Sequence, residues 1–279
     1  MKNFVRAFAP ANISLLFKVM PHDDPAKMGS LGCGFTVNEG VTVEVSIANK
    51  PAIIFNGKPI ELPTVTTVAN KLTRTVLVIH IQSHLPLGSG FGISGASALA
   101  TAYAANQLLS LNRSNLELAK LAHTAEVENK TGLGDVINQY YGGFFVKFVT
   151  SSQFVAEPIP ISDIPVYCIS YGKLLTSSIL NNPGAIAKIN HAADTGLFQI
   201  KQLLSKSTIS LSQIFTIAKQ FANDSSLLTS SRIMNTMKGI ETRGGHTTMI
   251  MLGEGIVADI PFDGATKLTI STAKASVLA

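Results

Sequence analysis

Residues 86–98 read PLGSGFGISGASA, a glycine-rich stretch that is the most informative part of the sequence. Residues 75–81, TVLVIHI, predict a strand before it, and the Ala- and Leu-rich residues 96–109 predict a helix after it. Backbone N–H groups at such a strand-to-helix turn can surround a phosphate, because glycine allows positive φ and has no Cβ to hold the phosphate away. The alternative is a flexible turn before a helix. The glycines fall within eight positions: Gly88, Gly90, Gly92 and Gly95.

The phosphate loop predicted here belongs to neither of two common types. It does not end in the Gly-Lys-Ser/Thr of a Walker A loop, and no acidic residue follows at the spacing of a dinucleotide-binding fingerprint. Ser89, Ser94 and Ser97 accompany the glycines at the entry to the helix. We therefore expect a phosphate site of a different family.

A second cluster lies downstream, where residues 122–143 read AHTAEVENKTGLGDVINQYYGG. Glu126 and Glu128 fall near the end of a helix predicted over 114–128, and Asp135 follows a glycine-bounded loop. An acidic residue on such a loop can act as a general base or bind a metal. It can equally be the N-cap of a helix that begins at Val136, and the spacing alone leaves these readings open.

The rest of the chain alternates predicted strands and helices, which indicates an α+β fold. Asn56-Gly57 predicts a hairpin between residues 52–55 and 58–62. A third glycine cluster, Arg243-Gly244-Gly245-His246, taken alone predicts a turn. Further strands are predicted over 41–48, 144–148, 166–171, 247–252, 256–260 and 268–271, and further helices over 185–204, 211–221 and 227–240.

Composition excludes several classes of protein. Hydrophobic residues make up 46% of the 279 residues and charged residues 14%, so the chain can bury a large core. No apolar run approaches the roughly 18 residues of a membrane-spanning helix. The two cysteines and six scattered histidines give no disulfide framework and no structural zinc motif, and we expect a cytoplasmic location.

The net charge of +5 is spread singly along the chain. Without a basic run, and with no tryptophan, the sequence lacks the platform of aromatic and basic residues that binds nucleic acid. We expect a small anionic substrate, and neither nucleic acid nor a membrane as a partner. A homodimer is left open.

Together the three glycine clusters resemble the GHMP small-molecule kinase superfamily. Residues 9–12 (APAN) stand at its N-terminal motif, 90–96 (GFGISGA) at its phosphate loop, and 243–246 with 249–253 at its late glycine-rich motif. Within the superfamily, three segments are most similar to the archaeal pantoate kinase branch: 29–34 (GSLGCG), 90–99 (GFGISGASAL) and 125–136 (AEVENKTGLGDV). The resemblance spans nearly the whole chain.

The resemblance implies a two-lobed fold with ATP and its acceptor bound in the cleft between the lobes. Two prolines near 158–164 suggest the joint, so that residues 1–160 form the N-terminal lobe and 161–279 the C-terminal lobe. Asp135 matches the catalytic aspartate of the family, and Ser94 and Glu126 would bind Mg²⁺. The expected nucleotide-binding residues are Pro86, Gly88, Ser89, Gly90, Phe91, Gly92, Ile93, Ser94, Gly95 and Ser97. The expected acceptor-binding residues are Asn12, Ser30, Leu31, Gly32 and Gly245.

Two positions depart from the branch. Pantoate kinases commonly carry His and Arg where this chain has Asn12 and Leu31. A leucine cannot replace an arginine that grips a carboxylate with two hydrogen bonds. Pantothenate, which is pantoate with its carboxylate capped by β-alanine, would not need that grip. We therefore expect an ATP-dependent kinase that phosphorylates the primary hydroxyl of pantothenate in coenzyme A biosynthesis.

Three alternatives remain at this point. The nearest is a pantoate kinase of the same pathway, and the next is a kinase or decarboxylase of the mevalonate pathway. A non-catalytic ligand-binding member of the superfamily is the third. The presence of Asp135, Ser94 and the loop glycines argues against this third alternative.

Overall fold

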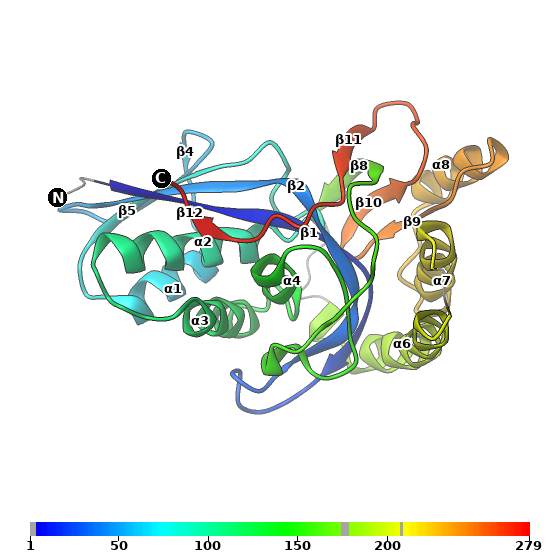
Figure 1. Cartoon of the computed structure of the whole chain (residues 1–279), viewed down its shortest axis with the longest axis horizontal. Coiled ribbons are helices and arrows are strands. Elements are labelled where there is room, and N and C mark those ends of the chain that lie inside the picture. The colour runs from blue at the N-terminus through cyan, green and yellow to red at the C-terminus, as the bar shows by residue number, and fades with distance from the viewer. Residues whose placement is uncertain (1–3, 174–178, 207–208) are drawn as a thin grey trace.

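The computed structural model describes residues 4–173, 179–206 and 209–279. These residues form an eight-stranded sheet and a four-stranded sheet, each with helices packed against it, so the expected α+β class is confirmed (Figure 1). The first sheet contains β1 (Phe4–Met20), β2 (Gly29–Ile47), β3 (Ala52–Phe55), β4 (Lys58–Pro59), β5 (Leu77–Gln82), β6 (Phe144–Lys147), β7 (Glu157–Pro158) and β12 (Ser276–Val277). The second contains β8 (Pro165–Lys173), β9 (Thr247–Ile250), β10 (Gly253–Ala258) and β11 (Thr266–Thr269), in the order β11-β8-β10-β9.

The long antiparallel pair of β1 and β2 joins the two halves of the molecule (Figure 1). β5 pairs with one end of β2, at residues 42–47, and β6 pairs with the other end, at 32–35. The sequence predicted a strand only over 41–48, because Pro10 and the polar residues after it interrupt the alternation of β1. The pairing register shifts between Pro10 and Asn12 and again between Ser14 and Leu16. Such irregularities admit a proline into a strand, and they place Asn12 and Ser14 beside the site described below.

The helix that follows the glycine-rich stretch is buried on nearly all sides. α2 (Ile93–Leu108) packs on β1 and β2, and α1 (Pro63–Leu72) and α3 (Asn115–Glu128) pack against α2. Its many alanines let these neighbours approach closely, and an apolar surface all round is typical of such a central helix. Sequence reasoning missed α1, because its threonines and valines have low helix propensity. Pro63 in the first turn supports the helix nevertheless.

Local signals fixed several other boundaries. Asn56 and Gly57 both have positive φ, 49° and 79°, as the predicted hairpin turn requires, although β4 is only two residues long. Ser114 caps α3, with Glu117 completing a capping box. α4 (Asp135–Tyr141) is a short helix that begins at Asp135. A 3₁₀ turn, Ser151–Gln153, follows β6.

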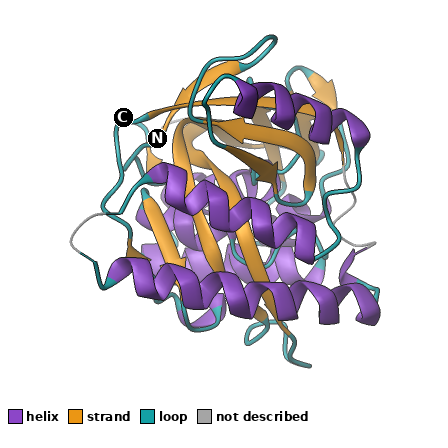
Figure 2. Cartoon of the chain, turned by 90° about the vertical axis from the view of Figure 1, so that its right-hand side faces the viewer, coloured by secondary structure: helices purple, strands orange, loops and turns teal. Residues whose placement is uncertain are grey.

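Three further helices belong to the second half of the chain. α6 (Pro183–Leu204) and α7 (Leu211–Asp224) pack on each other and on β1, and α7 also covers β9. α8 (Ser231–Thr242) packs on β9 and β10. Figure 2 shows these helices laid across the strands. The predicted helices are confirmed, except that residues 227–230 precede α8 rather than opening it.

The last strand returns to the first sheet. β12 pairs with β1, and Leu278 donates its backbone N–H to Arg6. Residues 158–164 run between β7 and β8, which belong to different sheets. The division of the chain at this point stays a prediction, because its last residues join the N-terminal sheet.

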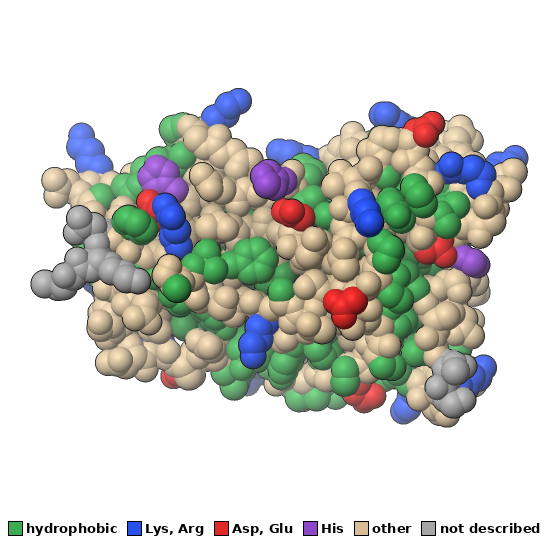
Figure 3. Space-filling view, turned by 45° about the horizontal axis from the view of Figure 1, so that its top comes forward, with side chains coloured by type: hydrophobic (Ala, Val, Ile, Leu, Met, Phe, Trp, Pro, Cys, Tyr) green, Lys and Arg blue, Asp and Glu red, His purple; other side chains and the backbone are tan. Residues whose placement is uncertain are grey.

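The surface carries no gathered charge on the side drawn in Figure 3, where basic and acidic side chains are interspersed. None of the helices in the described part of the chain has the length and apolar character needed to cross a membrane.

Candidate active site

The glycine-rich loop closes over a small pocket at the N-terminus of α2. Gly88, Gly90, Gly92 and Ser94 line it from the loop side, and Glu126, Thr131 and Asp135 line it from the second cluster. Met251 and Leu252, in the β9–β10 turn, line it from the second sheet. The pocket therefore combines the two sequence clusters with an edge of the second sheet.

The loop backbone is built to bind an anion. Gly92 is the N-cap of α2, and no side chain caps the helix there. The first backbone N–H groups of a helix have no partner within it, and the helix dipole adds partial positive charge at the same end. Gly92 has φ of 63°, and a Cβ on it would lie 3.0 Å from Gln139 Nε2 and 3.3 Å from the Asp135 Cβ. Only glycine fits both the conformation and this close approach.

Asp135 is the first residue of α4 and is not an N-cap. Its Oδ1 accepts hydrogen bonds from Asn12 Nδ2 at 2.6 Å and from Ser14 Oγ at 2.9 Å. The helix N-cap is Gly134, without a side-chain hydrogen bond. Among the described residues no donor reaches Oδ2, and Asp135 is only partly buried. The carboxylate is thus held by one oxygen and presents the other to the pocket.

A chain of amides holds Asp135 in place. Asn138 Nδ2 donates to Asn12 Oδ1 at 2.8 Å, and Asn12 in turn donates to Asp135. Lys147 Nζ begins this series of hydrogen bonds: it donates to Asn138 Oδ1 at 3.4 Å and to the Gly134 carbonyl at 3.3 Å. Each acceptor in this chain faces a donor, so the orientation of both amides is determined.

Lys147 is a cation that sequence reasoning missed. It lies on β6 and is only 3% exposed, which is rare for a lysine. Burial lowers the pKa of Lys147, and the charge of Asp135 opposes this effect. Burial raises the pKa of the Asp135 carboxyl, while the Ser14 hydrogen bond, the Lys147 charge and the Asn12 hydrogen bond lower it. A lone lysine in a strand gives no sequence signal of such a role.

Within the part of the chain that the structure describes, neither carboxylate oxygen of Glu126 has a hydrogen-bond partner, although the residue is only 1% exposed. Burial, followed by the nearby charge of Asp135, raises its pKa well above the usual value. A Cβ on Gly95 or on Gly132 would come within 3 Å of its carboxylate, so both glycines make room for it. A buried and unpaired carboxylate is costly unless something binds it.

Three hydroxyl groups meet at the rim of the same pocket. Ser94 Oγ donates to Thr64 Oγ1 at 3.2 Å, and Thr64 and Thr131 share a hydrogen bond at 2.9 Å. Thr64 lies in the first turn of α1, the helix that the sequence did not predict. Ser94 and Glu126 both line the pocket.

The structure places several predicted nucleotide-binding residues away from the pocket. Ser97 is fully buried, and its hydroxyl donates to the Ile93 carbonyl. Phe91 packs in the core, and Ser89 is buried with its carbonyl against Gly253. Pro86 lines a different hollow, together with residues of β8 and β11. Their side chains shape the loop rather than face the pocket.

None of the predicted acceptor-binding residues is among the residues that line the pocket in the described part of the chain. Asn12 is fully buried and orients Asp135, and Ser30 bonds to the Leu133 carbonyl on the far side of Gly134. Leu31 packs against the core, and Gly32 pairs with Lys147 in the sheet. A Cβ on Gly245 would clash with Ile260 and Ile240, away from the pocket, so a tight packing contact explains this glycine.

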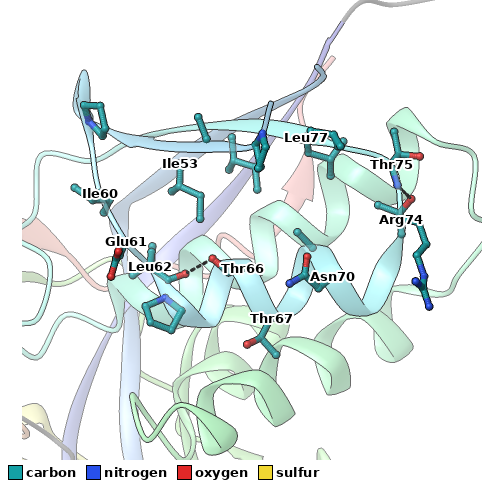
Figure 4. Close-up of a pocket in the computed structure, with 18 residues that line it drawn as sticks. Ile53, Ile60, Glu61, Leu62, Thr66, Thr67, Asn70, Arg74, Thr75 and Leu77 are labelled. Atoms are coloured by element: carbon teal, nitrogen blue, oxygen red, sulfur yellow. Dashed lines mark hydrogen bonds between the residues drawn. The ribbon is translucent and has the colours of Figure 1, made fainter. Parts of the chain in front are cut away.

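A second hollow, larger than this pocket, lies near the start of α1 and carries different chemistry. It measures about 1060 Å³ and lies between α1 and the strands β3 and β5 (Figure 4). Ile53, Ile60 and Leu77 line one side, and Thr66 and Asn70 line the other. Its walls are mainly apolar, which suits a flat ring better than a reacting phosphate.

Comparison with known proteins agrees with this geometry. The model of the GHMP kinases N-terminal domain matches residues 63–143, which include α1, the loop and Asp135. The pantoate kinase of Methanospirillum hungatei is 32% identical over 272 residues, covering 91% of this chain and 86% of that protein. The pantoate kinase of Methanocaldococcus jannaschii is also 32% identical, covering 86% of this chain and 90% of that protein.

Solved structures give the same result. A phosphotransferase related to the coenzyme A biosynthesis pathway superposes with a TM-score of 0.85 at 27% identity, covering 98% of both chains. A homoserine kinase from Cytophaga hutchinsonii shares the fold, with a TM-score of 0.69 at 19% identity, covering 100% of this chain and 98% of that one. The chain therefore belongs to the GHMP kinase superfamily, in the branch that contains the pantoate kinases.

Proposed function

We propose that the protein transfers the γ-phosphoryl group of ATP to the primary hydroxyl of pantoate. The observation that carries this proposal is the similarity to proteins named pantoate kinase along nearly the whole of both chains. It favours pantoate over the pantothenate expected from Leu31 and Asn12.

The site also supports pantoate over pantothenate. The expectation of pantothenate rests on Leu31, which leaves the acceptor carboxylate without a cation. Lys147 supplies a buried positive charge close to Asp135, and its two contacts are long, at 3.3 and 3.4 Å. Lys147 lies behind Asp135 and does not line the pocket, but its positive charge would attract the carboxylate of pantoate, which is only a few bonds from the reacting hydroxyl. Asn12, the second departure, has a role in holding Asp135 that needs no acceptor.

In this proposal Asp135 acts on the acceptor hydroxyl. Its free Oδ2 accepts the hydroxyl proton, while Asn12 and Ser14 keep Oδ1 fixed. A general base of this kind typically contributes about 10²–10⁴-fold in rate. The N–H groups of the loop and the α2 N-terminus receive the phosphate oxygens, where they stabilise charge on the transferred group.

The residues present fit Mg²⁺, which this family would use with ATP. Glu126 offers two unpaired carboxylate oxygens and Ser94 a hydroxyl, and Mg²⁺ is commonly held by one or two carboxylates plus substrate phosphates. Glu126 and Ser94 would hold the ion. When bound, it would neutralise charge on the phosphates of ATP.

The nucleoside of ATP is proposed to occupy the hollow between α1 and the strands β3 and β5. Thr64 at the start of α1 contacts Ser94 of the loop, so the hollow begins about one helical turn from the phosphate site. Its apolar walls would cover a purine ring (Figure 4).

The test is an acceptor comparison with product identification. The protein is incubated with ATP, Mg²⁺ and either pantoate, pantothenate or mevalonate, ADP release is followed, and the product is identified by mass spectrometry. We expect pantoate to be phosphorylated with a kcat/KM at least about tenfold above that of pantothenate, the ratio that about 1.4 kcal/mol gives. Equal or faster phosphorylation of pantothenate would overturn the choice of acceptor, and no ADP release with any of the three would overturn the proposed chemistry.

A further inference from the structure

The charges that line the phosphate pocket do not suit ATP by themselves. Glu126 and Asp135 are acidic, and no lysine or arginine is among the lining residues of the described chain. A triphosphate carries several negative charges, so a divalent ion alone leaves the complex anionic. Lys147 lies behind Asp135, where it contacts Gly134 and Asn138. A basic side chain at the mouth of the loop would offset this remaining charge.

Lys173 lies at that position. It is the last residue of β8, and its side chain extends over Gly88 of the phosphate loop. A Cβ on Gly88 would lie 3.5 Å from Lys173 Cγ, 3.4 Å from Cδ and 3.8 Å from Cε. The methylene groups therefore lie over Gly88, which lines the pocket, and the ammonium group is one bond beyond Cε. Lys173 is exposed, and a lysine whose methylene groups cover a neighbour commonly keeps its charged end in water.

The position of Lys173 relative to the loop is fixed by backbone packing. Lys173 pairs in the sheet with Gly253, and Gly253 packs directly against the Ser89 carbonyl. A Cβ on Gly90 would lie 2.7 Å from Ile250 and 3.0 Å from the Met251 carbonyl, so the β9–β10 turn also touches the loop. The second sheet thus rests on the phosphate loop and carries Lys173 with it.

The charge of Lys173 is available for a ligand. Lys18 and Lys219 form ion pairs with Asp194 and Glu241, whereas no ion pair of Lys173 occurs within residues 4–173, 179–206 and 209–279. A compact ammonium on a flexible stem is well suited to phosphate oxygens.

We propose that Lys173 binds the polyphosphate of ATP from the second sheet. The inference rests on the proposed function only in taking the loop as the nucleotide phosphate site, and it does not depend on the acceptor. Lys173 would add affinity for nucleotides with several phosphates over those with one. It would also tie binding to the contact between the second sheet and the loop.

The experiment measures nucleotide binding by titration calorimetry without any acceptor. Lys173→Met keeps the methylene packing over Gly88 and removes the charge, and Lys173→Arg restores a charge. Lys238→Met, on the exposed side of α8, is the matched control for the loss of one positive charge. Each protein is titrated with a non-hydrolysable ATP analogue plus Mg²⁺ and, separately, with AMP, at low and high salt.

We expect Lys173→Met to raise the Kd of the ATP analogue about tenfold, which corresponds to about 1.4 kcal/mol. The Kd of AMP should stay within about twofold, and added salt should narrow the difference because an exposed charge is screened. Lys173→Arg should recover most of the affinity, and Lys238→Met should resemble the unmodified protein. Equal weakening of AMP and the ATP analogue, or an unchanged Kd, would overturn the proposal. If the unmodified protein binds no nucleotide, the proposed function fails as well, whereas binding that is indifferent to Lys173 refutes this inference alone.

Discussion

Replacing Lys147 by methionine tests how the acceptor side of the site is built. Methionine keeps most of the length of the side chain but removes the buried charge near Asp135. Because Lys147 lowers the pKa of the Asp135 carboxyl while burial raises it, the variant should have a higher pKa at Asp135. A nearby positive charge favours the ionised carboxylate, so its removal leaves the effect of burial less opposed and raises the pKa of Asp135 further.

The sign of the effect follows from the role of Asp135 as a base. Asp135 must be ionised to accept a proton, so activity is lost as the pH falls through its pKa. A higher pKa in Lys147→Met moves that loss to higher pH. The assay is the pH profile of kcat/KM for pantoate, whose acidic limb reports the base in the free enzyme. We expect this limb to move to higher pH.

At a pH where Asp135 is fully ionised, Lys147→Met should still bind pantoate more weakly. If Lys147 also attracts the carboxylate of pantoate, the KM for pantoate should rise about tenfold or more, since hydrogen bonds to charged groups contribute roughly 1.5–3 kcal/mol. Lys238→Met serves as the charge control, and urea unfolding checks that the variant is folded. An acidic limb at the same pH in a folded Lys147→Met protein would refute the reasoning.

Two further predictions concern Glu126 and the hollow. Because the pKa of Glu126 is raised in the folded protein, the unfolded chain ionises first, and stability falls as the pH rises above about 4.3, the usual pKa of a glutamate. Glu126→Gln should therefore raise the melting temperature of the nucleotide-free protein at pH 7, and it should abolish most of the Mg²⁺-dependent activity. A lower melting temperature, or full activity, would contradict this role of Glu126. The chain has no tryptophan, so Thr66→Trp, at an exposed site in the hollow, introduces a single fluorescent reporter. ATP and adenosine should change its fluorescence, whereas inorganic triphosphate should not. If the fluorescence does not change in a variant that still binds ATP by calorimetry, the adenine ring binds outside this hollow.

The sequence predicted the central elements of the fold because their signals are local. The strand, glycine-rich loop and alanine-rich helix around residues 75–109 are a continuous pattern, and the Asn56-Gly57 turn has a strict conformational requirement. It missed β1, the first part of β2 and α1. A strand with bulges loses its alternation, and a helix rich in threonine and valine is stabilised by packing on α2.

The site was predicted in part for the same reason. Asp135 and Ser94 lie in recognisable motifs, and the structure brings them together in one pocket. The sequence predicted Asn12 as an acceptor-binding residue, whereas the structure shows it bonded to Asp135 and Asn138, which lie more than a hundred positions away. Lys147 carries no motif, and only the three-dimensional structure reveals its burial beside the carboxylate. Contacts that are distant in sequence are what a single sequence does not display.

Asp135→Asn should affect pantoate-dependent ADP formation and ATP binding very differently. Asparagine keeps the shape of the side chain but cannot accept the hydroxyl proton, and Asp224→Asn, at the exposed end of α7, is the control. The structure predicts that kcat falls by at least about 10²-fold, as expected for loss of a general base, while the Kd of ATP changes by no more than a few-fold. A kcat within about threefold of the unmodified protein, in a variant shown to be folded, would remove Asp135 from the reaction and contradict the proposed site.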